Sequence, residues 1–428
     1  MTEKKELEVK FLTNLSSEFK IDNSSFITIP INYDKENLNT LLKKLLKNNS
    51  LSNEKNFEFF IENKILESDL LAFLDEHSLL KKYTETPLEI YYFFELNEPK
   101  LINTIKENEW IKKICARNRD VLGKYCVGLF NSEVSFYDEN FEKMFDVKND
   151  PSEEDKIDFL NDLLFFKIEK TNVLITASRF DSELLRIYTI DFESKKSDLI
   201  LKDFKLSDEN ISSLSLNTLS PQFFSGGDSK GNLLIYKIED SFLTEKKEKV
   251  TDVKRKKKDF HKISPINKIE NCHDEIKCIK WMNTNQIATS GNDFNIKVFN
   301  INTNVHFCVL NSYYSVPTII NSSNEFVFSG HEDGKIRLWD LRTPVKPSLI
   351  FNAHNNYVSD IKFSPLSTQL FTTTSYDKTI KFFDLRASKP LWKIETANEK
   401  NFSLEFNSEK FLISGGDDSN INIFEINI

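Results

Sequence analysis

Cysteine is scarce in this sequence and is not arranged to bind a metal. The 428 residues include five cysteines, namely Cys115, Cys126, Cys272, Cys278 and Cys308. The number is odd, no pair has CxxC spacing, and none clusters with histidine. Disulfide frameworks and structural zinc sites need paired or closely spaced cysteines. The sequence therefore favours a reducing compartment and argues against structural zinc.

Long apolar runs are also missing. No stretch approaches the ~20 residues that a membrane-spanning helix requires. The first ten residues, MTEKKELEVK, are charged and lack the apolar core of a signal peptide. We expect neither a secretion signal nor a membrane partner.

The sequence offers no recognisable catalytic constellation. No Ser/His/Asp or Cys/His grouping stands out, and SGGDSKGN (225–232) lacks the GK[ST] ending of a phosphate-binding loop. The net charge of −9 gives no general reason to bind nucleic acid, so such binding would need a local basic patch. We expect no enzymatic activity and no cofactor held by this chain alone.

The chain does contain enough apolar material for globular domains. Hydrophobic residues make up 39% of it, with 37 phenylalanines. Its length exceeds what one small core accommodates and suits a small and a large domain. We place them at residues 1–97 and 98–428.

Residues 1–97 alternate between strand and helix patterns. Four runs show the alternation of half-buried strands, and two place apolar residues on one helical face. The strand runs are LEVKF (7–11), FITIPI (26–31), FEFFIE (57–62) and PLEIYYF (87–93); the helical runs contain Leu38, Leu41, Leu42 and Leu45 after the capping Asp34, and then Leu70, Phe73 and Leu74. The order strand, strand, helix, strand, short helix, strand predicts a ubiquitin-like β-grasp domain.

One acid stands before the last of these strands, in KKYTETPLEIYY (81–92). Glu85 falls in the connection between the short helix and that strand. Pro87 restricts its own φ and biases Thr86 towards extended geometry, so the turn should be stiff. Glu85 is either a solvated loop acid or a residue held out for binding.

Residues 98–428 repeat one strand motif seven times. Each copy alternates β-branched and aromatic residues; in the clear copies an aspartate stands six residues before the aromatic. The aromatic anchors are Tyr137, Tyr188, Tyr236, Phe299, Trp339, Phe383 and Phe424, and the aspartates are Asp293, Asp333, Asp377 and Asp418. Three of the six spacings between these anchors are 40, 44 and 41 residues, within the ~40–45 residues of a WD repeat. We predict a mostly β protein whose second domain is a seven-bladed WD-repeat β-propeller, with the aspartates forming turns.

Two histidines are placed to close the side-chain networks of blades. We expect blade four to join His273, Thr289 and Asp293, and blade six to join His354, Thr373 and Asp377. Phenylalanine replaces the tryptophan donor in both blades, since Trp339–Asp340 is the sole literal WD pair. For both histidines we favour this structural role over catalysis or metal binding.

The end of the chain and one long spacing predict two further features. The sequence ends at Ile428, just after a third strand, so a fourth must come from elsewhere to cover the edge. We predict that LINTIKENEW (101–110) supplies it and closes the ring.

The 63-residue spacing before Phe299 predicts a lysine-rich insert at about 241–264, between blades three and four. Its basic run consists of Lys254, Arg255, Lys256, Lys257 and Lys258. Such a run is typical of nuclear targeting or of RNA phosphate contact. The alternative is a merely solvated charged loop.

The combined architecture resembles the Notchless-like (NLE) family of ribosome assembly factors. The resemblance is carried by VKFLTNL (9–15), FEFFIENKILESDLLAFLDEH (57–77) and TETPLEIYY (84–92), and it extends through the propeller and its basic insert. One branch, Notchless, has eight blades and a longer chain. The other is the WD-repeat subunit of the PeBoW complex. Seven blades, 428 residues and an internal basic loop favour the second branch.

The resemblance implies a non-enzymatic assembly factor for the large (60S) ribosomal subunit and its rRNA processing. The implied location is the nucleolus and nucleoplasm. The implied partners are Pescadillo, the block-of-proliferation WD-repeat protein, the AAA ATPase midasin and the pre-60S particle, with direct rRNA contact left open. The alternatives are a Notchless-type factor acting later in 60S maturation and a propeller substrate adaptor of a ubiquitin ligase.

The same resemblance implies a role for the turn before the last strand. In that family the metal-ion-dependent adhesion site (MIDAS) of the ATPase grips one glutamate of the ubiquitin-like domain. Carried onto this sequence, that residue is Glu85, flanked by Thr84 and Thr86. It would complete the coordination of Mg²⁺ or a similar divalent ion held by the partner. If the register differs, the next acid is Glu89, within the strand.

Overall fold

The computed structural model describes residues 6–13, 21, 26–46, 56–62, 64–95, 97–116, 124–148, 159–178, 185–204, 209–238, 265–323, 326–365, 367, 369–387, 389–396, 400–408 and 410–426. Packing divides the chain into two compact units. One is Met1–Glu98 with Asp384–Ser388 and Asn427–Ile428, and the other is Pro99–Phe383 with Lys389–Ile426. None of the helices in these described ranges has the length and apolar content needed to cross a membrane.

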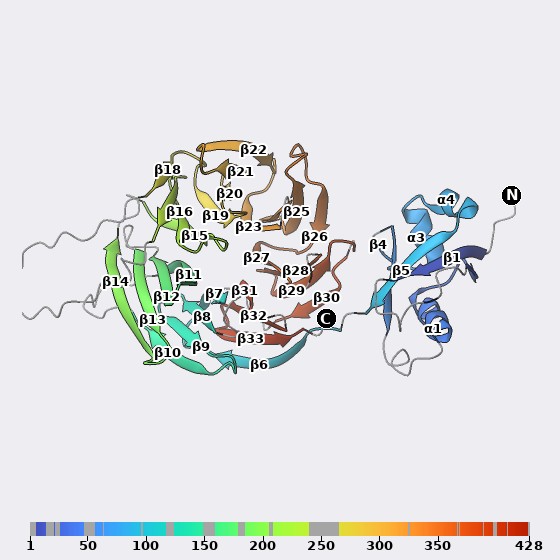
Figure 1. The fold of residues 1–428 in the computed structure, drawn as a ribbon, viewed down its shortest axis with the longest axis horizontal. Helices are drawn as coiled ribbons and strands as arrows, with labels where there is room; N and C mark the ends of the chain where they lie inside the picture. Colours follow the sequence, from blue (N-terminus) through green and yellow to red (C-terminus); the bar gives the residue numbers. More distant parts are fainter. Residues whose placement is uncertain are drawn as a thin grey trace, which may run out of the picture. The chain divides into compact units, whose positions relative to one another are not determined.

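The N-terminal unit is a ubiquitin-like β-grasp domain with a five-stranded sheet (Figure 1). Its elements are β1 (Glu6–Leu12), β2 (Ile27–Pro30), α1 (Lys35–Leu45), β3 (Phe57–Ile61), β4 (Lys64–Ile65), α3 (Leu70–Glu76), α4 (Leu80–Glu85) and β5 (Leu88–Phe94). The strand order is β2-β1-β5-β3-β4. The central strand β5 therefore pairs in parallel with β1 and antiparallel with β3.

The alternating apolar residues of these strands form one core with the two longer helices. Val9, Phe59 and Tyr92 are fully buried there together with Leu38 of α1 and Leu70 of α3. The Asp34 side chain caps α1 by accepting a hydrogen bond from the Asn37 N–H, at 2.8 Å. The six predicted elements of this domain are present in the predicted order, and the structure adds the short strand β4 and the short helix α4.

The connection before β5 differs from the sequence prediction in one respect. It contains a second short helix, α4, that runs through Glu85, so only Thr86 and Pro87 link this helix to β5. Thr86 has the extended backbone expected before proline, with φ −123° and ψ 150°. Glu85 thus ends a helix instead of lying in an open loop.

The second unit is a seven-bladed propeller built from four-stranded sheets, as counted over the described residues. Blade one consists of β7 (Ile111–Ala116), β8 (Tyr125–Leu129), β9 (Val134–Tyr137) and β10 (Lys143–Val147); blade two of β11 (Leu160–Ile168), β12 (Thr171–Ser178), β13 (Leu185–Asp191) and β14 (Lys196–Phe204); and blade three of β15 (Ile211–Leu216), β16 (Phe223–Asp228), β17 (Leu233–Lys237) and β18 (Asn267–Ile269).

The remaining four blades follow in chain order around the ring (Figure 1). Blade four consists of β19 (Ile276–Trp281), β20 (Gln286–Gly291), β21 (Asn295–Asn300) and β22 (Val305–Asn311); blade five of β23 (Pro317–Ser323), β24 (Phe326–His331), β25 (Lys335–Asp340) and β26 (Leu349–Asn352); blade six of β27 (Val358–Phe363), β28 (Leu370–Ser375), β29 (Thr379–Asp384) and β30 (Trp392–Glu395); and blade seven of β31 (Asn401–Phe406), β32 (Phe411–Gly416), β33 (Asn420–Glu425) and β6 (Lys100–Lys106). The first strand of each blade contacts the first strand of the next, and β31 contacts β7, so the ring is closed.

All seven aromatic anchors lie where the repeat predicts them, on the third strand of a blade. Each is buried, from Tyr137, Tyr236 and Trp339 at 0% exposure to Tyr188 at 6%. The predicted closure is also confirmed, because β6 pairs antiparallel with β33 and supplies the fourth strand of blade seven. The Thr104 hydroxyl donates a hydrogen bond to Asn422 Oδ1 across this seam, at 3.0 Å.

The position predicted for the lysine-rich insert is wrong by one strand. The fourth strand of blade three, β18, follows the insert and pairs with β17, so the insert interrupts blade three and does not separate it from blade four. The three-residue β18 has too little alternation to be recognised in the sequence. The basic run Lys254–Lys258 lies outside the described residues.

Each innermost strand contains a β-bulge near its start. Neither the composition nor the spacing of the strands predicted these bulges. In each blade the pairing between the first and second strands shifts after the first residue of the innermost strand. A bulge disrupts the ladder locally, and the N–H of the fourth residue then donates to a side chain. The seven donors are Ile114, Leu163, Leu214, Ile279, Ile320, Ile361 and Leu404.

The acceptors of these seven amides join neighbouring blades. Ser213, Cys278 and Ser403 each accept from the next blade, at 3.3, 3.4 and 3.1 Å. Asp162 and Asp360 each accept hydrogen bonds from two backbone amides. Their Oδ1 atoms accept from an amide of their own blade, and their Oδ2 atoms accept from an amide of the next blade. Each of these aspartates follows a blade whose equivalent residue, Lys113 or Ile319, has no acceptor atom. The ring thus satisfies every one of these bulge amides.

Candidate functional site

The segment that carries Glu85 is held by the turn between β3 and β4. Tyr83 is 8% exposed, and its hydroxyl donates to Glu62 Oε1 at 2.7 Å. Lys82 forms an ion pair with the same carboxylate and lies 4.9 Å from the Tyr83 ring centroid. The bonds from Lys82 and Tyr83 hold the pKa of Glu62 below its usual value. Two consecutive residues of α4 are therefore tied to one carboxylate.

The C-terminal end of α4 is closed by Thr86. Its N–H and its hydroxyl both donate to the Lys82 carbonyl, at 3.2 and 2.9 Å. The side chains of Thr84 and Glu85 lie outside the described part of the chain. Glu89, the alternative acid, is exposed on β5, where it pairs with Lys10 of β1.

The network predicted for blade four is assembled in the structure. His273 Nδ1 lies 2.7 Å from Asp293 Oδ1, and His273 Nε2 lies 2.8 Å from Thr289 Oγ1. Burial opposes ionisation of Asp293, but its bonds to His273 and Lys297 hold its pKa well below the usual range. Phe299 occupies the tryptophan position and is buried. Phenylalanine provides no donor to Thr289, whose hydroxyl donates to the Lys297 carbonyl, at 3.3 Å.

Blade six repeats this arrangement with His354. Its Nδ1 lies 3.0 Å from Asp377 Oδ2, and its Nε2 lies 2.9 Å from Thr373 Oγ1. Gly334 of the preceding blade leaves room for the backbone of His354, because a Cβ at position 334 would lie 2.2 Å from the His354 carbonyl oxygen. The φ of Gly334 is +75°, which also favours glycine.

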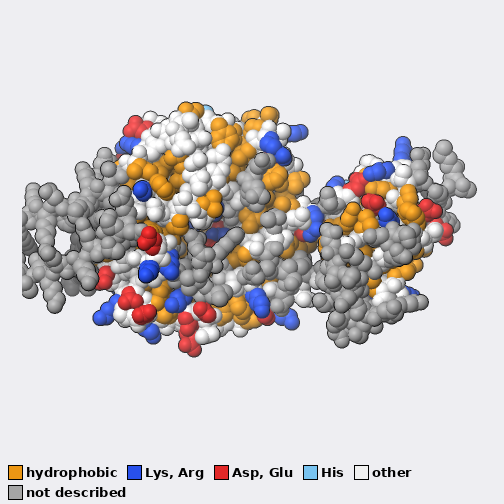
Figure 2. Space-filling model, in the orientation of Figure 1, with side chains coloured by type: hydrophobic (Ala, Val, Ile, Leu, Met, Phe, Trp, Pro, Cys, Tyr) orange, Lys and Arg blue, Asp and Glu red, His pale blue; other side chains and the backbone are white. Residues whose placement is uncertain are grey.

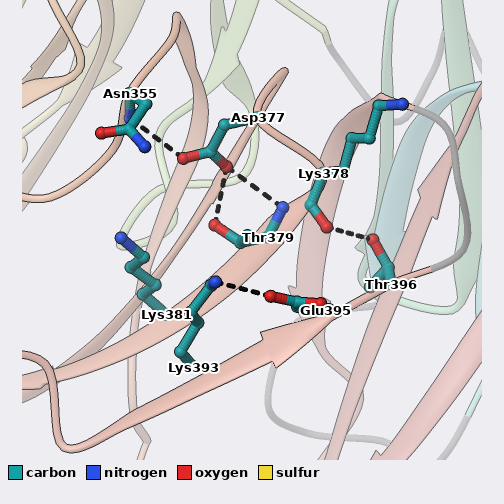
Figure 3. Close-up of a pocket in the computed structure, with 8 residues that line it drawn as sticks. All are labelled: Asn355, Asp377, Lys378, Thr379, Lys381, Lys393, Glu395 and Thr396. Carbon is teal, nitrogen blue, oxygen red and sulfur yellow. Dashed lines mark hydrogen bonds and ion pairs between the residues drawn. The ribbon is translucent and has the colours of Figure 1, made fainter.

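A shallow hollow of about 340 Å³ lies beside this network, lined by Asn355, Asp377, Lys378, Thr379, Lys381, Lys393, Glu395 and Thr396 (Figure 3). Asp377 accepts hydrogen bonds from the Thr379 hydroxyl and from the Asn355 N–H, at 2.6 and 3.0 Å. Lys393 pairs with Glu395 at 2.6 Å. Both carboxylates in this hollow, Asp377 and Glu395, are thus already bonded to neighbouring groups.

Blade five contains a network that was not predicted from the sequence. Trp339 Nε1 donates to Ser329 Oγ at 2.8 Å, and Ser329 Oγ lies 2.7 Å from His331 Nε2. His331 Nδ1 lies 3.3 Å from the Ser315 carbonyl oxygen. His331 therefore plays the same structural role as His273 and His354. It does so from the second strand of its blade, whereas His273 and His354 lie in the loops that precede their blades. The signal was available in FSGHED, where the histidine precedes the turn aspartate by two residues.

The two remaining turn aspartates also bond locally. Asp333 forms a bidentate pair with Arg337, with distances of 2.7 and 3.2 Å, and Asp418 accepts from the Asn420 N–H at 3.0 Å. No three His, Cys, Asp or Glu side chains in the described ranges are grouped to hold a metal ion. The geometry of these blade residues is that of turns and blade networks.

Comparison with known proteins agrees with this architecture. Residues 7–74 match the NLE (NUC135) domain, and residues 310–340 and 345–384 match the WD domain, G-beta repeat. The chain therefore combines a region similar to the NLE domain with a propeller that contains matches to the WD repeat.

Relatives with the name ribosome biogenesis protein WDR12 homolog match the chain over most of its length. The one from Nematostella vectensis is 23% identical over 99% of this chain and 100% of its own. The one from Trichoplax adhaerens is also 23% identical, over 99% and 97%. The one from Drosophila yakuba is 19% identical over 91% and 88%. Both structural units are thus covered by these similarities.

Proposed function

We propose that this chain is a ribosome biogenesis protein that assists assembly of the large (60S) subunit and its rRNA processing. The observation that supports this is similarity over the whole length, through both units, to ribosome biogenesis proteins. The closed ring of seven described sheets favours the PeBoW-type branch over an eight-bladed Notchless-type factor. The chain acts as a scaffold, and any ATP hydrolysis belongs to its partner.

The propeller binds Pescadillo and the block-of-proliferation protein. The AAA ATPase midasin grips the ubiquitin-like unit and so releases the chain from the pre-60S particle. Such a specific propeller contact should bury at least about 1,200 Å². The basic run Lys254–Lys258 directs the chain to the nucleus and nucleolus. A role as a ubiquitin-ligase adaptor remains the alternative, and binding to a ligase scaffold would identify it.

Glu85 provides the grip by completing the metal coordination of the ATPase. Mg²⁺ takes oxygen ligands in near-octahedral geometry, so one carboxylate can fill an open position. Glu85 ends α4 immediately before the exposed residues Thr86 and Pro87. Because this segment is short and pinned at Tyr83, little ordering is needed on binding.

The topology suits a mechanical handle. Force applied at Glu85 enters the N-terminal end of β5 and leaves at its C-terminal end towards the propeller. Such force is carried by the covalent backbone of β5, while its hydrogen-bond ladders to β1 and β3 lie outside the load path. The unit can therefore transmit a pull to the propeller without unzipping one bond at a time.

The proposal is tested by purifying the tagged chain and measuring its partners. The wild type should retain pre-60S particles, Pescadillo, the block-of-proliferation protein and the ATPase. Glu85→Ala should lose the ATPase and keep the others. Glu89→Ala tests the alternative register, and Glu76→Ala, an exposed acid of α3, is the matched control. A wild-type chain without pre-60S particles would overturn the function, and ATPase retention by Glu85→Ala would overturn the role of Glu85.

A further inference from the structure

Glu62 lies in the turn that joins β3 to β4 and has a backbone that favours neither a strand nor a helix. Its φ is +49°, in the left-handed region that non-glycine residues adopt infrequently. That turn brings its side chain to α4, which is 20 residues away in sequence at Lys82 and 21 at Tyr83. A glycine or an asparagine would adopt this conformation more readily than glutamate does.

The contacts of Glu62 fix α4 from one side. Tyr83 is nearly buried and its hydroxyl binds Glu62, so the side chain cannot change its χ1 rotamer without losing this bond. Lys82 binds the same carboxylate, while its backbone carbonyl accepts both bonds from Thr86. The main chain at Glu85 is therefore bounded by an anchored residue two positions before it and a capping residue directly after it.

We infer that Glu62 is a positioning residue that holds α4 in the conformation in which Glu85 reaches the metal of the partner. This inference rests on the proposed function. A helix of six residues has little stability of its own and depends on tertiary contacts. Without Glu62, α4 spends less time in the conformation that can bind the ATPase. The apparent affinity for the ATPase falls in proportion to the population of that conformation.

The kinetic consequence separates positioning from direct contact. Glu62 acts before binding, so Glu62→Ala should slow association about tenfold and leave dissociation unchanged. Glu85 acts in the complex, so Glu85→Ala should abolish binding or accelerate dissociation. Glu62→Gln retains an acceptor oxygen for Tyr83 and should restore most of the association rate. Tyr83→Phe should reproduce part of the Glu62→Ala effect.

The experiment measures association and dissociation of the full chain on the immobilised metal-binding domain of the ATPase, with Mg²⁺ and with EDTA. Glu76→Ala is the control for loss of an exposed acid. Hydrogen exchange at the Thr86 amide, which should accelerate in Glu62→Ala while amides of β5 stay protected, checks that the unit remains folded.

Two outcomes are distinguishable. If Glu85→Ala binds as the wild type does, the proposed grip is wrong. If Glu85→Ala fails to bind but Glu62→Ala associates at the wild-type rate, the grip stands and the positioning role of Glu62 is wrong.

Discussion

At the scale of single residues, His331 has the most enclosed environment of the network histidines. It is 0% exposed, compared with 5% for His273 and 7% for His354. Burial, reinforced by the nearby Arg337, lowers the pKa of His331 to about 3, and the attraction of Asp333 only partly offsets this. The ring is therefore neutral in the folded protein at physiological pH, while in the unfolded chain it titrates near its ordinary value of about 6.5.

This difference makes the propeller sensitive to mild acid. Between about pH 6.5 and pH 3, only the unfolded state binds a proton at His331. The contribution of His331 to the free energy of unfolding is therefore fully present above this range and is lost as the pH falls through it. From pH 7 to pH 5 the loss due to His331 should be about 2 kcal/mol. All four tryptophans lie in the propeller, so their fluorescence in urea unfolding at both pH values reports the change. His331→Asn should remove that part of the pH dependence, and an unchanged dependence would contradict the prediction.

Sequence patterns identified two of the three network histidines. His273 and His354 stand 20 and 23 residues before their aspartates, the arrangement of a regular blade. His331 was missed because its side chain replaces the regular loop histidine from the end of the second strand. FSGHED places a histidine two residues before the turn aspartate, but the contacts of His331 with Ser329 and with the Ser315 carbonyl become evident only in three dimensions.

At the scale of elements, the bulge amides of the innermost strands give a graded test. Asp360 caps the amides of Ile361 and Leu404, at 2.8 and 3.0 Å, whereas Ser213 caps only that of Ile279. An unsatisfied buried N–H costs roughly 1–3 kcal/mol. Asp360→Ala should therefore lower the free energy of unfolding by about 4 kcal/mol and Ser213→Ala by about 2 kcal/mol.

Asp360→Asn provides the internal control for this series. Asparagine keeps one acceptor oxygen, so it can cap one amide and should lie between the wild type and Asp360→Ala. Urea unfolding of all three variants measures the order. If Asp360→Ala and Ser213→Ala lower the free energy of unfolding equally, the second hydrogen bond accepted by Asp360 contributes nothing to stability.

The elements that sequence predicted well are those with strong alternation. The four longer strands of the β-grasp domain and the third strands of the blades were recognisable from one buried face, whereas the two-residue β4 was not. The helix α4, LKKYTE, was missed because Leu80 and Tyr83 are too few apolar residues to set a helical period, and because Tyr83 is held by Glu62, 21 residues away in the sequence. The insert was misplaced because β18 has only three residues. Bulges were invisible because they depend on pairing between strands.

At the scale of the whole molecule, closure of the ring joins residues that are far apart in the sequence. The seam between β6 and β33 includes the bond from Thr104 to Asn422, which are 318 residues apart. The sequence predicted this closure because a ring that ended at the third strand of blade seven would expose an edge. Breaking the seam should therefore open the ring, whereas damage to another outer strand affects one blade.

Thr104→Pro and Lys393→Pro test this difference with matched changes. Each places proline in a fourth strand, β6 or β30, where proline disrupts the ladder. β30 follows β29 closely in the chain, so its blade remains tethered after disruption. β6 pairs with β33 and so closes a loop that contains almost the whole propeller. Loss of this pairing gives the chain back the conformational entropy that closing this loop removed. We expect Thr104→Pro to raise the unfolding rate of the propeller, measured by pulse proteolysis, at least about tenfold more than Lys393→Pro. Equal rates would mean that the seam is no more important than any other blade edge.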